Sequence, residues 1–272
     1  FQAVFIINDF NVSFPVPPFP CLAMPSTAPL ELWQLLAALG LIAIALSLSI
    51  WQQLGLTWNF MLSTGRALLQ LGAVGYVLAV AFTGSTPGLT LVLVLVLLTV
   101  AAIFTRNRIS SKLPRLLPVV WSSLGTGVIL TVLYAVVVVI QPADPLDPRY
   151  WIPLTAGVLS SATATAGIAG EQLMVSLSQS RFDIEARLSL GATPAQAIAP
   201  YRRQAVRAAV LPTLNTLTVV GMVSLPGFLS GELLGGVEPL TAAAYQTLLL
   251  MMMACSSLVT ALLITSGIRR RC

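Results

Sequence analysis

Residues 181–207 read RFDIEARLSLGATPAQAIAPYRRQAVR and carry seven of the charged residues of the chain, which has 14 basic and nine acidic residues in all. The stretches on either side, 157–170 and 208–231, contain no charged residue. A charged, helix-patterned segment between apolar runs of membrane-spanning length is expected to lie in water, outside the bilayer. Such a loop is a place where a soluble partner could deliver energy to a membrane protein.

The rest of the 272-residue chain is predominantly apolar, with 8% charged and 57% hydrophobic residues overall. Soluble domains are about a quarter charged, so this composition predicts an integral membrane protein. Continuous apolar runs such as 89–100 favour helices over the alternating strands of a transmembrane barrel. We therefore predict an all-α polytopic bundle of about seven transmembrane helices, at residues 30–50, 64–83, 88–104, 119–140, 151–175, 212–234 and 242–265.

Basic residues predict how the bundle is oriented. Of the 14 Lys and Arg residues, only Arg149 falls on the opposite side of the predicted bundle from the others. The positive-inside rule then places the N-terminus outside and the C-terminus in the cytoplasm, in the plasma (inner) membrane. The net charge of +5 reflects this topology, and we expect no nucleic-acid partner.

The chain divides into an extension, a membrane domain and a tail. Residues 1–29 have no basic n-region and are interrupted by prolines, so they do not resemble a signal peptide. We expect them to form an extension with little order, with the natural start at Met24. Residues 30–268 form the membrane domain, which contains the loop 179–211, and 269–272 form a basic cytoplasmic tail.

Within the loop, two short helices are expected. The first covers residues 182–190 and stops at Gly191. Thr193 offers a side-chain cap, and Pro194 suits the first turn of the second helix. The second helix has a basic face formed by Arg202, Arg203 and Arg207. One interpretation is an interfacial helix held at the headgroups by its arginines; the other is an element that docks onto a soluble partner.

Several loop motifs resemble the coupling loop of ABC transporter permeases. They are Glu185-Ala186, Leu190-Gly191-Ala192-Thr193-Pro194, Gln196 and Leu211-Pro212. The resemblance implies that the loop docks in a groove of a cytoplasmic ATPase. The residues that would make this contact are Glu185, Ala186, Leu190, Gly191, Ala192, Thr193, Pro194 and Gln196. In the commonest importer permeases the Gly and the Leu-Pro pair are closer together, which argues against that subgroup.

Further motifs are similar to the permease family of Fet-type bacterial iron exporters, to which plant aluminium-tolerance permeases also belong. The similarity covers residues 30–268. Its motifs are Gly65–Leu71, Gly75–Leu78, Arg207-Ala208-Ala209, Thr218–Gly221, Val223–Gly227, Tyr245-Gln246 and Met252. The chain departs from the family at Ser161-Ala162, where a Gly-Asn pair is usual, and at Glu232, where relatives often have Gln or an apolar residue.

The resemblance implies a permease subunit of an ABC transporter that exports iron or another metal-related solute. It also implies a cytoplasmic ATPase partner that binds ATP-Mg, and a homodimer of this chain surrounded by lipid. The chain itself contains no phosphate-binding loop and no nucleophile paired with a base, so we expect neither catalysis nor a bound cofactor. The alternatives are an importer-type permease, a nucleotide-sugar transporter subunit and a membrane scaffold that transports nothing.

The sixth predicted span is a candidate for the pathway lining or the dimer seam. Its Ser224-Leu225-Pro226-Gly227 motif would loosen a helix in mid-membrane. Carbonyl groups freed in this way are tolerated only against protein or a water-filled path; a kink required for packing is the alternative. The candidate pathway residues in this span are Asn215, Pro226, Gly227, Gly231 and Glu232.

Arg66 and Gln70 on the second span complete the candidate pathway set. Arg66 would either extend to the cytoplasmic headgroups or pair with Glu171 of the fifth span. The chain has no His, and its remaining oxygen and sulfur donors suggest no metal cage. The spacing of Cys21, Cys255 and Cys272 indicates neither a disulfide framework nor a zinc site.

Overall fold

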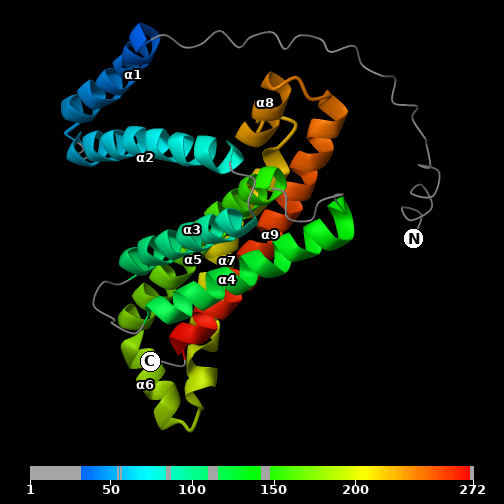
Figure 1. Cartoon of the computed structure of the whole chain (residues 1–272). Helices are drawn as coiled ribbons and strands as arrows, with labels where there is room; N and C mark the ends of the chain where they lie inside the picture. Colours follow the sequence, from blue (N-terminus) through cyan, green and yellow to red (C-terminus); the bar gives the residue numbers. More distant parts are fainter. Residues whose placement is uncertain are drawn as a thin grey trace.

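The computed structural model describes residues 32–53, 55, 57–83, 87–109, 116–141 and 148–269, and the secondary-structure elements within them are helices (Figure 1). The predicted N-terminal extension and the last three residues of the predicted tail lie outside these ranges. The elements are α1 (Leu32–Trp51), α2 (Thr57–Thr83), α3 (Pro87–Ile109), α4 (Leu117–Tyr134), the π-helix η2 (Ala135–Ile140), α5 (Pro148–Gln179), α6 (Arg181–Ser189), α7 (Pro194–Val219), α8 (Gly227–Leu234) and α9 (Pro239–Arg269).

Four of the described helical segments are long and apolar enough to cross a membrane. They are Thr90–Ile109, Leu117–Ile140, Trp151–Gln179 and Pro239–Arg269. The predicted all-α membrane bundle is therefore confirmed. The predicted spans at 30–50 and 64–83 correspond to α1 and α2, which are helical, and the total of seven spans stays a prediction.

Helix α5 lies at the centre of the bundle and packs against α3, α4, α7 and α9. Its contact surface includes small residues, since Ala162, Ala166 and Ala169 are fully buried. A Cβ atom at Gly170 would collide with Ile109 of α3. In lipid, helices associate through close van der Waals packing of this kind, since the surrounding hydrocarbon is as apolar as the side chains.

The contact between α4 and α9 depends on glycine in the same way. A Cβ atom at Gly127 of α4 would overlap Thr260 of α9 and would lie 3.3 Å from the backbone oxygen of Ser256. A Cβ atom at Gly267 of α9 would overlap Val119 of α4. The two backbones therefore approach closely at two places along the same pair of helices.

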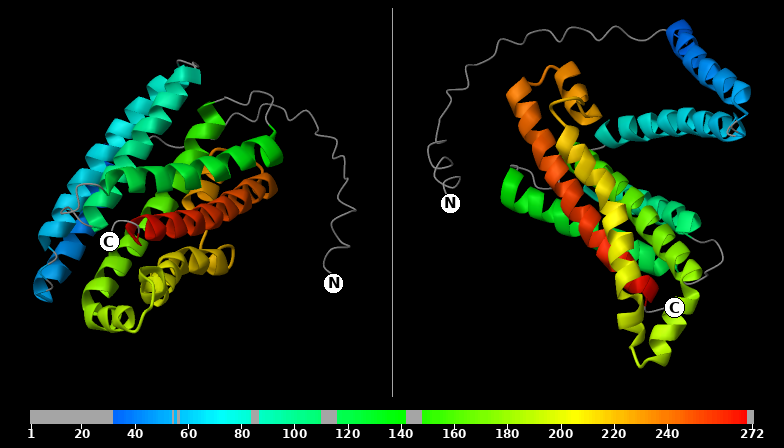
Figure 2. Two further views of the ribbon diagram at one scale, coloured as in Figure 1. Left: turned by 90° about the horizontal axis from the view of Figure 1, so that it is seen from below. Right: turned by 180° about the vertical axis from the view of Figure 1, so that it is seen from behind.

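Helices α1 and α2 pack against each other at the edge of the molecule, and α2 makes few contacts with α5 (Figures 1 and 2). Their large apolar side chains are open, among them Leu41, Leu69 and Tyr76. Such a surface suits lipid or a second protein chain.

The prediction that residues 212–234 form a single helical span is wrong, because the helix is interrupted within this range. Helix α7 begins in the loop and continues to Val219; residues 220–226 are not helical, and α8 then begins at Gly227. Gly221 has a φ of +79°, which reverses the chain, and its N–H donates to the Ser224 carbonyl at 3.1 Å. The break thus begins at Val220 rather than as a kink at Pro226, which is instead the N-cap of α8.

Candidate functional site

Helix α6, the turn that follows it and the first turn of α7 form a tight elbow at residues 181–196. Gly191 has a φ of +88°, a conformation that residues with a Cβ rarely adopt. The Gly191 N–H donates to the Leu188 carbonyl at 3.0 Å, and the Ala192 N–H donates to the Arg187 carbonyl at 3.1 Å. These bonds close the end of α6, so the predicted helix and its stop at Gly191 are confirmed.

A reciprocal pair of hydrogen bonds fixes the start of α7. The Gln196 N–H donates to Thr193 Oγ1 at 3.3 Å, and the Thr193 N–H donates to Gln196 Oε1 at 2.9 Å. This is a capping box, and Pro194 occupies the first turn, where its missing N–H costs nothing. The predicted cap at Thr193 is confirmed, and the elbow is stiff on its α7 side.

The elbow presents apolar side chains to its surroundings. Phe182 is 84% exposed and Leu190 is 88% exposed, and no residue of α6 is buried. Arg181 Nε donates to Glu185 Oε1 at 2.8 Å within the same helix, which raises the pKa of the Arg181 guanidinium. Figure 1 shows the elbow projecting beyond the bundle, near the C-terminal end of α9. An exposed, rigid, partly apolar projection is suited to contact with another protein.

Arg66 does not pair with Glu171, so that interpretation is wrong. The Glu171 carboxylate instead accepts a hydrogen bond from Arg108 Nε of α3 at 3.4 Å. Arg66 lies on the exposed side of α2, with its guanidinium 5.9 Å from the centre of the Phe104 ring, within cation–π range. Gln70 is exposed on the same helix.

The candidate pathway residues of the predicted sixth span lie on both sides of the break. Asn215 is exposed on α7, and a Cβ atom at Gly227 or Gly231 would meet nothing within 4 Å. Glu232 has one carboxylate oxygen enclosed without a hydrogen-bond partner among the described residues.

A buried glutamine connects the break to the bundle. Gln246 of α9 is 4% exposed, and its Oε1 accepts the Leu229 N–H at 3.2 Å. It therefore satisfies one of the free amide groups at the start of α8. The sequence had indicated Gln246 only as a family motif, without a role.

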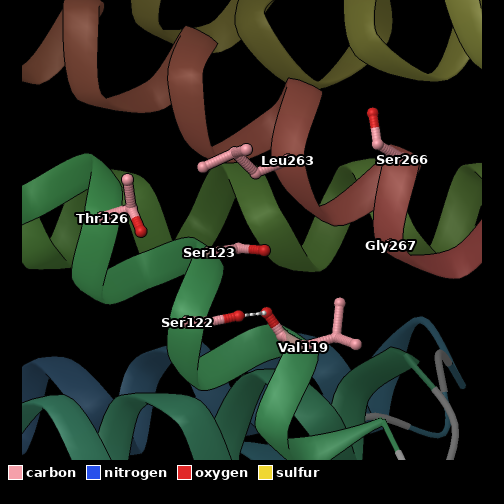
Figure 3. A pocket seen from close by; sticks show the side chains of 7 residues that line it. All are labelled: Val119, Ser122, Ser123, Thr126, Leu263, Ser266 and Gly267. Atoms are coloured by element: carbon pink, nitrogen blue, oxygen red, sulfur yellow. Dashed lines mark hydrogen bonds between the residues drawn. The ribbon is translucent and has the colours of Figure 1, made fainter.

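Sequence reasoning missed a hydroxyl-lined cavity of about 330 Å³ between α4 and α9 (Figure 3). Its lining consists of Val119, Ser122, Ser123, Thr126, Leu263, Ser266 and Gly267. Two of the hydroxyls donate to their own helix: Ser122 to the Val119 carbonyl at 3.1 Å, and Ser266 to the Leu262 carbonyl at 2.6 Å. Uncharged oxygens of this kind can replace the hydration water of a polar solute without trapping it.

More hydroxyls continue into the bundle from α9. Ser256 and Thr260 are fully buried, and their oxygens have no partner among the described residues. Ser257 Oγ is 3.2 Å from Ser161 Oγ of α5 and accepts a hydrogen bond from Thr213 Oγ1 of α7 at 3.5 Å. Ser161 of α5, Ser257 of α9 and Thr213 of α7 therefore form a polar contact among three helices.

The cavities and the predicted pathway residues do not coincide. A second cavity, of about 270 Å³, is lined mainly by apolar residues of α3, α4 and α5. A third is lined by arginines of α7 and α9. None of the seven predicted pathway residues lines any of these three cavities. Within the described residues, no three His, Cys, Asp or Glu side chains are close enough to hold a metal ion.

Comparison with known proteins places the whole membrane domain in one family. Residues 32–272 match a family described as "Uncharacterised protein family (UPF0014)". A membrane protein of that family from Synechocystis is 42% identical over 86% of this chain and 90% of its own length. The probable iron export permease protein FetB of Escherichia coli is 33% identical over 82% of this chain and 85% of its own.

A plant relative matches over a similar share of both chains. The protein ALUMINUM SENSITIVE 3 of Arabidopsis thaliana is 30% identical over 83% of this chain and 81% of its own length. No solved structure matches the chain significantly. The resemblance to iron-export permeases and to plant aluminium-related proteins is confirmed.

Proposed function

Because the chain belongs to the uncharacterised membrane protein family UPF0014, we propose that it is the permease subunit of an ABC transporter. The observation that supports this most directly is the elbow, with its Gly191 turn, capping box and exposed Phe182 and Leu190. A separate cytoplasmic ATPase would bind ATP-Mg and dock on this elbow. The predicted orientation, with the C-terminus in the cytoplasm, places the elbow on the same side as the ATPase.

Helix α7 provides the link between docking and the membrane. It extends without interruption from the capping box to Val219, next to the break before α8. It also packs against α5 and α9, which line much of the bundle interior. A movement of the elbow would therefore reach the centre of the bundle through one element, and ATP binding could alternate the access of the interior to the two sides.

For the cargo, we propose iron or another metal-related solute, moved outward. The name of the Escherichia coli relative supports this substrate, and the hydroxyls between α4 and α9 supply neutral oxygen contacts. Weak contacts suit transport, since a solute must leave the site as readily as it enters.

We also propose that two copies of the chain meet at the break between α7 and α8. Val219 lies twelve positions after Arg207, a rise of about 18 Å. If Arg207 lies at the headgroups, the break falls within a hydrocarbon layer about 30 Å thick. Irregular backbone at that depth must be covered by protein or line a water-filled path. Met222 is 86% exposed in the single chain, and Gly221, Gly227 and Gly231 have open space beside them.

Cysteine cross-linking tests the proposed seam. Cys21, Cys255 and Cys272 are first replaced by serine, and Met222→Cys is then introduced. Mild oxidation in native membranes is expected to convert most of this variant into a disulfide-linked dimer. Leu69→Cys, at a similarly open position on α2, serves as the matched control and should stay monomeric. Equal yields for the two variants would place the contact elsewhere or show only random collision.

Reconstitution tests the permease function itself. The chain is purified together with its candidate ATPase and placed in vesicles, and the movement of Fe²⁺ and other cations is measured with and without ATP. We expect ATP-dependent movement of a metal-related solute and hydrolysis that the solute stimulates. Transport of a different solute would refute the iron proposal alone, whereas the absence of any associated ATPase would refute the permease proposal.

A further inference from the structure

A cavity of about 430 Å³ between α7 and α9 brings together four arginines. The lining residues are Ala195, Ala199, Arg202, Arg203, Val206, Arg207, Leu262 and Arg269. Arg202, Arg203, Arg207 and Arg269 form what we call the arginine pocket. Three of these residues come from α7 and one from the last turn of α9, so the pocket exists only because the two helices pack together.

No carboxylate of the described residues forms an ion pair with these arginines. Within the described residues the two ion pairs are Arg108–Glu171 and Arg181–Glu185, and both lie outside the arginine pocket. Arg202 Nε donates to Thr265 Oγ1 of α9 at 3.3 Å, which holds this guanidinium beside α9. Arg203 and Arg207 lie one helical turn apart, where like charges repel. An anion between the guanidinium groups would relieve this repulsion.

The surroundings of the pocket indicate which anion fits. Leu262 of α9 lines the cavity, and Leu258, one turn further from the C-terminus, is open. On α7, Leu211 and Leu214 are open beyond Arg207. Both helices therefore carry exposed leucines directly next to the basic end. This arrangement of charged and apolar residues matches a phospholipid, in which a charged headgroup is joined to hydrocarbon chains.

We propose that the arginine pocket binds the headgroup of an anionic phospholipid, whose acyl chains lie along the exposed leucines of α7 and α9. Guanidinium groups bind phosphate oxygens through paired, charge-assisted hydrogen bonds. Basic pockets between membrane helices are known to suit anionic headgroups. Since α7 also carries the elbow, a bound lipid would fasten α7 to α9 at the membrane surface. The inference concerns lipid binding alone and does not depend on transport.

Lipid binding to the detergent-purified full chain tests this inference. Phosphatidylglycerol and phosphatidylcholine with identical acyl chains are added, and retained lipid is counted by native mass spectrometry. We expect a clear preference for phosphatidylglycerol. Arg203→Gln with Arg207→Gln should reduce that preference roughly 25-fold, because each basic residue near a membrane surface contributes roughly fivefold. Arg203→Lys with Arg207→Lys should retain most of it.

The matched control removes two arginines that lie outside the pocket. Arg181→Gln with Arg187→Gln changes the net charge equally and should leave the lipid preference unchanged. Circular dichroism and size-exclusion chromatography without added lipid establish that every variant is folded. An unchanged preference in the Arg203/Arg207 glutamine variant would overturn the inference.

A third arm separates lipid from other sources of phosphate. Glycerophosphoglycerol, which is the headgroup without acyl chains, should compete only weakly with intact lipid. If it binds as tightly as the lipid, the pocket is a site for soluble phosphate compounds and the lipid proposal fails. Loss of ATPase association with unchanged lipid preference would identify the pocket as a protein docking surface instead.

Discussion

Gly127→Leu is expected to separate α4 from α9 and to cause a large loss of stability. Even a Cβ atom at this position would overlap Thr260, which is fully buried, and would press on the Ser256 backbone oxygen. A backbone atom cannot rotate away as a side chain can, so the helices would have to move apart. Overpacking of this kind costs typically 1–3 kcal/mol and occasionally more.

Thermal unfolding in detergent measures this effect. A loss of this size corresponds to a decrease in the apparent Tm of roughly 2–12 °C, and Gly127→Ala should show a smaller decrease in the same direction. Gly75→Leu on α2 is the control, because a Cβ atom there would meet nothing within 4 Å. Equal melting temperatures for Gly127→Leu and Gly75→Leu would show that α4 and α9 do not approach closely.

The second large effect is expected at the elbow. Phe182→Ser combined with Leu190→Ser removes two exposed apolar side chains and should leave the fold intact, since neither side chain is buried. If these side chains anchor the ATPase, each loss costs about 2–4 kcal/mol of binding, as at the centres of other protein interfaces. ATPase association and ATP-driven transport should therefore decrease at least 100-fold.

A matched variant distinguishes docking from a general change in surface polarity. Leu240→Ser replaces a similarly open leucine at the start of α9, at the end of the molecule away from the elbow. It should leave ATPase association unchanged. Normal ATPase association in the Phe182/Leu190 double variant would exclude these residues from the contact and would remove the main support for an ATP-driven permease.

Local signals made the elbow predictable from sequence. The stop at Gly191, the cap at Thr193 and the proline after it depend on residues within one or two turns, and the structure contains all three features. The bonds that form them do not require any other helix. For the same reason the hydrocarbon-length runs predicted a helical membrane bundle.

Contacts between helices could not be predicted in the same way. Similar depth in the membrane suggested that Arg66 pairs with Glu171, but depth does not determine which side of a helix a residue occupies, and Arg108 is the actual partner. The motif at Pro226-Gly227 predicted a kink, but the sequence did not show that the helix already ends at Val219, because the residues that follow are predominantly apolar. The α4–α9 cavity escaped notice because its serines and threonines are neutral and scattered along two distant segments.

The length of α7 has a mechanical consequence. Its 26 residues form a single element of about 39 Å, which begins at the elbow and ends beside the reversal at Gly221. If its far end were held fixed, a tilt of only about 10° would displace the other end by about 7 Å, a distance comparable to one helical turn. Under the proposed function, a small closing motion of the docked ATPase would therefore produce a displacement along α7 large enough to open a path through the bundle.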